Sequence, residues 1–184
     1  MPDNNNIAFS TLMGNRIRFA ELSSPVLTSV GDGDLIDVVA DENQEDVYVN
    51  LFDRDQVPIY LELGATVSID RPARKFLGNG YVIFDYQSEN DFKFIGISAK
   101  RNRLVIGHRD TEGWHLDATS QLGMQYGREY DMRIVLNYST ASLVINNSKS
   151  VSHTFADNIS DGDLGLGVNK SSSHFKDFNF LTFP

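Results

Sequence analysis

The chain of 184 residues contains no cysteine. This absence excludes a disulfide framework, a thiolate metal site and a cysteine nucleophile. It does not confine the chain to a reducing compartment, because many bacterial surface proteins also lack cysteine.

Long hydrophobic runs are missing too. No stretch is long enough to span a bilayer, and the N-terminal MPDNNNIAF has neither the basic nor the apolar segment of a signal peptide. If the natural protein is exported, its signal lies outside this chain, as it would for a module of a longer polypeptide. We therefore expect a secreted or cell-surface location within such a polypeptide, without direct insertion into a membrane.

Positive charge is scarce. The 16 Lys and Arg residues face 25 Asp and Glu residues, which gives a formal net charge of -9. Binding to nucleic-acid phosphates needs a surplus of positive charge, so a nucleic-acid partner is not expected. The length and the 41% hydrophobic content suit a single domain over residues 1–184, with the polar residues 1–6 disordered and the isolated domain a monomer.

Helical periodicity is absent, and alternation with period two takes its place. Between Pro58 and Asp70 the apolar residues alternate with polar ones, which predicts a half-buried strand. Residues 78–118 carry runs of Val, Ile, Phe and Tyr interrupted by SEN, AKRN and RDTEG, a pattern typical of antiparallel strands joined by short turns. Further strands are expected at 7–9, 16–19, 35–40, 47–52, 129–137, 142–146, 151–155, 162–168 and 175–183, with an acidic connector at 41–46. About a dozen strands predict an all-β fold, a two-sheet antiparallel jelly-roll sandwich.

Several segments, in order along the chain, resemble a known family. They are GNGYVIFDYQSENDFKFIGISAKRNRLVIGHRDTEGWHLDA, then YDMRIVLNYSTASLVINN, SHTFADNISDGDLGLGV and FKDFNF. Together they resemble the concanavalin A-like, LamG-type jelly roll, above all the copies found in long bacterial surface and adhesin polypeptides. The resemblance covers residues 46–180 and implies two stacked antiparallel sheets of about six or seven strands. Domains of this kind include lectins, carbohydrate-binding modules, protein adhesion modules and a minority of glycanases and lyases.

Catalytic patterns are not found in the sequence. Retaining glycanases of this fold resemble one another in a strand with Glu-x-Asp-x-x-Glu, and the nearest group here, Asp32, Asp34 and Asp37, contains no glutamate. The Arg, Gln-x-His and Tyr strands of related alginate lyases are missing, as are a Gly-x-Ser-x-Gly elbow and a phosphate loop. The four histidines show no metal-ligand spacing. We therefore expect a non-catalytic module.

The central strands, by contrast, supply residues for a candidate binding surface. If the SEN turn closes symmetrically, Asp85 faces Lys93, and if residues 100 and 101 centre the next turn, Lys93 lies beside His108. This parity assigns the row of Asp85, Lys93 and His108 to the outward face, as the polar part of a ligand site. The same parity assigns Phe84, Phe92 and Phe94 to the core. A plain cross-strand ion pair beside a histidine is the alternative interpretation of the row.

Trp114 is the only tryptophan and lies near Arg109 and His115. An aromatic face with neighbouring polar donors suits sugar rings, so Arg109 and Trp114 complete the candidate ligand site. Packing of Trp114 in the core or at its rim is the alternative. A carbohydrate or cell-surface glycan is the expected partner, with protein recognition or a spacer role as the other option.

A structural calcium ion is the one expected cofactor. The resemblance implies a site near the chain ends, in which Asp177 matches the aspartate of the final strand in calcium-bearing relatives. Oxygen ligands at turns suit this cation, so Asp34 is the second expected ligand. Asp161 and Asp163 are alternatives, and each of these carboxylates could instead cap a turn or a strand.

Overall fold

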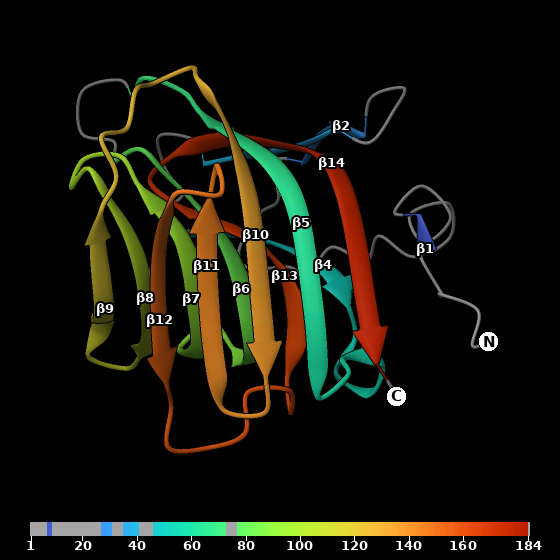
Figure 1. Cartoon of the computed structure of the whole chain (residues 1–184). Helices are drawn as coiled ribbons and strands as arrows, with labels where there is room; N and C mark the ends of the chain where they lie inside the picture. The colour runs from blue at the N-terminus through green and yellow to red at the C-terminus, as the bar shows by residue number, and fades with distance from the viewer. Residues whose placement is uncertain (1–6, 9–26, 31–34, 41–45, 73–76, 184) are drawn as a thin grey trace.

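Two antiparallel sheets stacked face to face form the protein (Figure 1). The computed structural model describes residues 7–8, 27–30, 35–40, 46–72 and 77–183. Its only described helix is the short 3-10 turn η1 (Arg54–Gln56), and no described helix is long and apolar enough to cross a membrane. The predicted all-β sandwich is confirmed.

Sheet A faces the viewer in Figure 1. Its strands follow the order β12-β11-β10-β5-β14-β3-β2, and β1 pairs with β14 beside this path. The eight strands are β1 (Ile7–Ala8), β2 (Leu27–Val30), β3 (Ile36–Val39), β5 (Tyr60–Ile69), β10 (Glu129–Asn137), β11 (Thr140–Ile145), β12 (Lys149–Thr154) and β14 (Ser172–Phe183).

Sheet B lies behind sheet A and follows the order β4-β13-β6-β7-β8-β9. Over the described residues the sheets hold eight and six strands, where the resemblance implied about six or seven in each. The six strands are β4 (Asp46–Phe52), β6 (Asn79–Ser88), β7 (Asp91–Ser98), β8 (Arg103–Asp110), β9 (Gly113–Gln121) and β13 (Asp163–Asn169).

The main core lies between the sheets. In β5 every second residue from Leu61 to Ile69 is buried, as the alternation predicts, and sheet B contributes Phe84, Ile95 and Ile106 from its inner face. Burying one side chain of this size stabilises the fold by about 1.5–3 kcal/mol. The strands predicted at 129–137, 142–146 and 151–155 are also confirmed, and they form a meander in which β10 pairs with β11 and β11 with β12.

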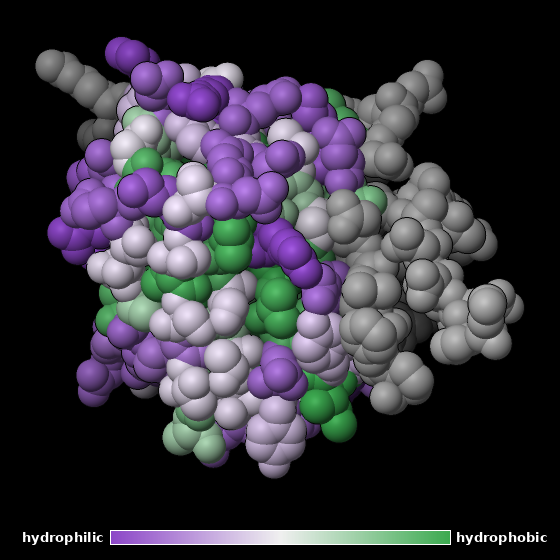
Figure 2. Space-filling model, in the orientation of Figure 1, coloured by the Kyte–Doolittle hydropathy of each residue, from purple (hydrophilic) through white to green (hydrophobic). Residues whose placement is uncertain are grey.

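The outer face of sheet A is polar. Figure 2 shows it as purple and white side chains with smaller green areas between them. Arg133 Nη2 lies 2.6 Å from a Glu62 carboxylate oxygen, and the hydroxyls of Ser142 and Ser152 are 2.8 Å apart across β11 and β12. These residues meet water and each other, which is the usual state of an antiparallel sheet with one solvated face.

The outer face of sheet B is apolar instead. Its side chains form a second buried cluster that consists of Tyr48, Tyr81, Ile83, Tyr86, Phe92, Phe94 and Val105, with Trp114 packed against it. Large side chains lie across glycines of the neighbouring strand. A Cβ added to Gly107 would lie 2.5 Å from the Phe94 ring, and one added to Gly165 would lie 2.5 Å from the Tyr48 ring. Glycine is therefore required where these rings cross the sheet.

The first central hairpin has a different register from the predicted one. Ser88 pairs with Asp91 across a two-residue turn, but Phe84 rather than Asp85 pairs with Lys93, because β6 bulges between Phe84 and Ser88. Asp85 sits in this bulge with φ of 50°. The next turn follows the prediction, since Lys93 pairs with His108.

This bulge corrects the predicted faces of sheet B. Phe84 is in the main core as expected, but Phe92 and Phe94 lie on the outer face with Trp114. Lys93 and His108 lie on the inner face, because they alternate with Phe92 and Phe94 in β7 and with Gly107 and Arg109 in β8. The outward assignment of the row of Asp85, Lys93 and His108 is therefore wrong. Both faces of sheet B are apolar, so alternation alone could not tell them apart.

Some predictions fall outside the described residues. These are the disorder of residues 1–6, the strand at 16–19, most of the acidic connector and the calcium ligand Asp34.

Candidate functional site

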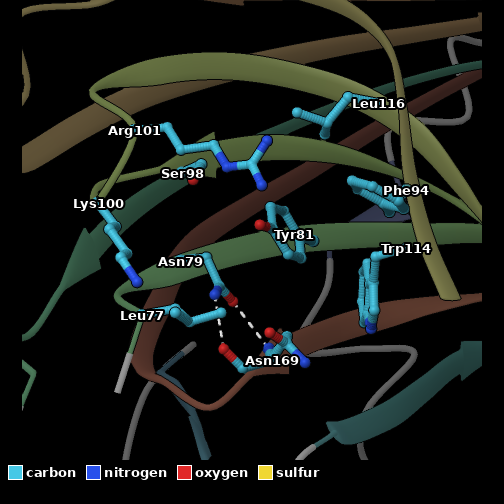
Figure 3. A pocket seen from close by; sticks show the side chains of 10 residues that line it. All are labelled: Leu77, Asn79, Tyr81, Phe94, Ser98, Lys100, Arg101, Trp114, Leu116 and Asn169. Atoms are coloured by element: carbon cyan, nitrogen blue, oxygen red, sulfur yellow. Dashed lines mark hydrogen bonds between the residues drawn. The ribbon is translucent and has the colours of Figure 1, made fainter. Parts of the chain in front are cut away.

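A pocket of about 300 Å³ lies over the outer face of sheet B. Figure 3 shows aromatic side chains on one side of it and basic ones on the other, with Tyr81 between them. The apolar lining comes from Leu77, Tyr81, Phe94, Trp114 and Leu116, and the polar lining from Asn79, Ser98, Lys100, Arg101 and Asn169.

The aromatic wall is built by cross-strand packing. Trp114 on β9 meets Phe94 on β7, with ring centroids 4.8 Å apart, and Tyr81 on β6, with centroids 5.7 Å apart. The wall can form because β8, which lies between β7 and β9, presents Gly107 at this position. Trp114 therefore both packs on the sheet and lines the pocket, so the two interpretations of this residue are compatible.

An amide pair forms part of the polar wall. Asn79 Nδ2 donates to the Asn169 carbonyl oxygen at 2.6 Å, and the Asn169 backbone N–H donates to Asn79 Oδ1 at 2.8 Å. Asn169 Nδ2 donates in turn to Asp46 at 2.5 Å. Both amides are thus held in place by β6, β13 and β4, which gives the pocket a fixed polar edge.

The tyrosines of this face remain protonated at neutral pH. Burial raises the pKa of the Tyr81 hydroxyl. Burial, followed by the charges of Glu89 and Asp163, raises the pKa of Tyr86 to about 12. The hydroxyls are therefore neutral donors and acceptors rather than charges.

Lys100 and Arg101 form the basic side of the pocket. Both lie in the turn between β7 and β8 and are exposed. The turn is closed by the Asn102 N–H, which donates to the Ala99 carbonyl oxygen at 2.9 Å. No carboxylate is among the residues that line this pocket in the described part of the chain.

Two of the predicted ligand residues lie together at this face. Arg109 and Trp114 are cross-strand partners, and the guanidinium carbon of Arg109 is 6.0 Å from the Trp114 ring centroid. Arg109 Nη2 also donates to Asn90 at 3.3 Å. The buried donors Trp114 Nε1 and Arg109 Nε have no hydrogen-bond partner among the described residues. Trp114 lines the pocket, whereas Arg109 supports the hairpin beside it.

The other three predicted ligand residues lie on the opposite face of the sheet. Lys93 forms an ion pair with Asp85, their side chains being 17% and 9% exposed, and its ammonium lies 5.4 Å from the Phe155 ring centroid. His108 pairs with Asp117 through Nδ1 at 2.8 Å. The five residues predicted as one ligand site therefore form two groups, separated by the sheet itself.

The inner-face group contains an arrangement that the spacing of the histidines does not predict. His108 and His115 are cross-strand partners with stacked rings, 4.8 Å between centroids. Ligand atoms of His108, Asp110 and His115 lie within 4.8 Å of one another, which would allow them to hold a metal ion. The sequence does contain a signal in the turn, because His108 and His115 are equally far from its two central residues, Thr111 and Glu112.

The calcium site stays a prediction. Asp177 is exposed in a bulge of β14 with φ of 55°, and Asp34 lies outside the described residues. Asp163 accepts the Arg54 N–H at 2.7 Å, and Asp161 accepts Asn158 Nδ2 at 2.9 Å. Asp163 thus bonds to the first residue of η1, and Asp161 bonds within the turn at 158–161.

Sequence reasoning missed most of the polar lining. Asn79 and Asn169 are 90 positions apart, and only the pairing of β6 with β13 brings them together. Lys100 and Arg101 were assigned to a turn, correctly, but not to a site. Nothing in the local sequence indicates that this turn borders the Trp114 pocket.

No family model matches the chain, and no curated protein matches it. The chain is similar in fold to solved structures. The carbohydrate-binding module CBM66 from Bacillus subtilis has a TM-score of 0.62 and 12% identity over 82% of this chain and 96% of that one.

Two further similar structures differ in how much of their own length this chain covers. A toad ovary galectin in complex with thio-digalactose has a TM-score of 0.52 and 12% identity, covering 74% of this chain and 98% of that chain. Aspergillus kawachii beta-fructofuranosidase has a TM-score of 0.56 and 11% identity, covering 82% of this chain but 27% of that one. Such identities establish the fold alone: the chain is a concanavalin A-like jelly-roll β-sandwich.

Proposed function

We propose that this domain is a non-catalytic carbohydrate-binding module that holds its sugar in the pocket against Trp114. The observation that supports this proposal is the pocket itself, in which an aromatic wall faces fixed amide groups and basic side chains. Sugar rings present C–H faces edged by hydroxyls, and such a pocket offers a partner for both.

The similar structures support this proposal. One is a carbohydrate-binding module by its description, and another is a galectin described in complex with thio-digalactose. Their likeness to this chain is in fold, so the pocket carries the argument for the ligand.

The absence of carboxylates from the described lining favours binding over catalysis. Most glycosidases need two carboxyl groups on either side of the scissile bond, about 5–9.5 Å apart. A glycosidase is nevertheless among the similar structures. Incubation with glucans, galactans and alginate therefore tests this part of the proposal, and release of any product would contradict it.

The basic side of the pocket favours an acidic sugar. Lys100 and Arg101 can form charge-assisted hydrogen bonds with a carboxylate or sulfate group, and such bonds are stronger than neutral ones. The net charge of -9 would repel an acidic polymer elsewhere on the protein. Selectivity for a sugar with an anionic group should therefore depend on this turn.

The wider setting of the module is part of the same proposal. The LamG-type resemblance supports a place in a longer adhesin-like polypeptide, secreted or at the cell surface, with a calcium ion at Asp177 and Asp34. If calcium is structural, a chelator should lower the melting temperature, because an ion that binds only the folded state stabilises it.

Glycan-array binding with the intact chain is the direct test. Trp114→Ala should abolish the signal, and Arg101→Gln should weaken binding of anionic sugars by about tenfold, the loss of one charge-assisted contact of 1.5 kcal/mol. Tyr138→Ala is a matched control, because Tyr138 is 61% exposed in the turn between β10 and β11.

Fluorescence gives a second measurement, since Trp114 is the only tryptophan. Its emission should change on addition of a glycan that binds. Arg101 is exposed, so Arg101→Gln should fold normally and remains informative if Trp114→Ala is unstable. Absence of binding to every glycan would favour the alternative, a spacer or protein-recognition module.

A further inference from the structure

The hairpin of β8 and β9 carries a second group of polar residues on the face opposite Trp114. His108, Asp110 and His115 bring their ligand atoms within 4.8 Å of one another. The two histidine side chains are 39% and 38% exposed, so the group is open to solvent. The two strands that carry the group also pack against β12 of sheet A.

The hairpin fixes the positions of these side chains. Asp110 Oδ1 accepts the N–H groups of Glu112 and Gly113, at 2.8 and 3.1 Å, and thereby closes the turn. The same oxygen is 2.9 Å from His115 Nε2. Two of the three candidate ligand atoms are thus already in contact.

The carboxylate of Asp117 orients the third candidate ligand, His108. Asp117 occupies a bulge in β9 opposite the step from Ile106 to Gly107, and its Oδ2 is 2.8 Å from His108 Nδ1. A neutral His108 that donates from Nδ1 to Asp117 keeps the lone pair of Nε2 for a metal. Histidine ligands commonly have such a carboxylate behind them.

We propose that His108, Asp110 and His115 bind a divalent transition metal of the zinc type, with Asp117 orienting His108. Two imidazole nitrogens and one carboxylate oxygen suit zinc, nickel or copper, whereas calcium takes oxygen ligands. Ligand atoms around tetrahedral zinc lie about 3.4 Å apart at metal–ligand distances near 2.1 Å. His115 and Asp110 need to separate by a few tenths of an ångström, and His108 needs to approach, to reach this geometry.

The charged side chains around the three candidate ligands are compatible with a bound cation. Lys93 is the cross-strand neighbour of His108, but its ammonium is paired with Asp85 and lies over the Phe155 ring. The carboxylates of Asp110 and Asp117 remain to offset the charge of the ion. Water would complete the coordination, since this end of the hairpin is open.

The test is a zinc titration of the intact chain without a polyhistidine tag, followed by calorimetry and by the visible absorption of bound cobalt. We expect one metal ion per chain. His108→Gln and His115→Gln should weaken binding by more than about 100-fold, and Asp117→Asn by about 10-fold or more, the range found for residues that orient metal ligands. His174→Gln is the control, because His174 lies on β14 and bonds to Asp37 and Asp70, so its loss should leave the affinity unchanged.

Three results would overturn the proposal: no zinc binding by the wild-type chain, binding that survives in a His108→Gln, His115→Gln double variant, or an equal loss in the His174→Gln control. Side-chain NMR of the wild-type histidines provides a measurement that does not depend on the folding of any variant. Zinc should perturb the His108 and His115 signals, and perturbation of His174 alone would contradict the site. Glycan binding is independent of this outcome, because the pocket lies on the other face of the sheet.

Discussion

The outer faces of the two sheets differ in the side chains that cover their strands. On sheet A, hydroxyls and ion pairs such as Arg133–Glu62 face water. On sheet B, a layer of aromatic side chains covers the strands and is itself buried, with Phe94 only 1% exposed. The outer face of a sheet can therefore carry a second apolar cluster when the side chains of that face lie along the strands and cover one another.

Glycine makes this difference possible. The rings of Tyr48 and Phe94 cross Gly165 and Gly107 of the adjacent strands, where any side chain would collide with them. The pocket lies on this aromatic layer beside Trp114, and the turn at 99–102 forms one of its borders. The aromatic side chains of sheet B thus lie along the strands rather than pointing outward into water, and they line the pocket of the proposed sugar site.

Truncation of a ring should show the largest contrast between the faces. Phe94→Ala removes a buried side chain that contacts Tyr81 and Trp114, so we expect a loss of about 3–5 kcal/mol in the free energy of unfolding. Val144→Ala on the outer face of β11 is the control, and should cost less than about 1 kcal/mol because that residue is only partly buried. Urea denaturation measures both, and equal losses would mean that the aromatic layer is not a packed cluster.

Filling a glycine should have the next largest effect. A Cβ at Gly165 would lie 2.2 Å from the Val49 carbonyl oxygen, which belongs to the backbone of the paired strand and cannot move away easily. Gly165→Val should therefore destabilise the protein by about 1–3 kcal/mol. Ser150→Val on exposed β12 should change stability by less than about 0.5 kcal/mol. A thermal melt in which Gly165→Val matched Ser150→Val would show that β13 and β4 can separate to admit a side chain.

The smallest effect concerns charge on sheet A. Burial alone lowers the pKa of His174, but hydrogen bonds from its ring to Asp37 and Asp70 outweigh this and raise the pKa above 6.5. A raised pKa in the folded state means that His174 contributes stability below the unfolded pKa, and that this contribution is lost as the pH rises through the folded pKa. The pair is partly exposed, so the contribution is in the range of surface pairs, about 0.2–1 kcal/mol.

His174→Asn tests this by the difference in unfolding free energy from the wild-type chain. The difference should be larger at pH 5.5 than at pH 9. His153→Asn is the control, since its histidine contacts the ring of Phe155 instead. A difference that grows toward high pH would contradict the assigned sign.

Much of the fold could be predicted because local patterns and tertiary burial agree. The alternation in β5 gave its buried face, and the turn at residues 100 and 101 gave the register of β7 and β8. The register of the SEN hairpin could not be predicted, although the hairpin itself was, because the bulge at Asp85 shifts the pairing without changing the composition of either strand.

Less of the site could be predicted. Trp114 and Arg109 were correctly placed together, since they are partners around a two-residue turn. Asn169 reaches the pocket only through the pairing of β13 with β6, which no local pattern indicates. His108 and His115 are register partners, as Arg109 and Trp114 are, so the same turn predicts both pairs, whereas the spacing of histidines along the chain does not indicate the first.

The sequence by itself determined the all-β class, most strand limits and the hairpin that carries Trp114, because period-two alternation and turn residues act over a few positions. The tertiary structure alone decided which face of sheet B points to the core. Both faces of that sheet are apolar, and one bulge in β6 reverses the pairing parity, so the choice depends on what sheet A covers. That choice separated Lys93 and His108 from Trp114, and with them the candidate metal site from the candidate sugar site.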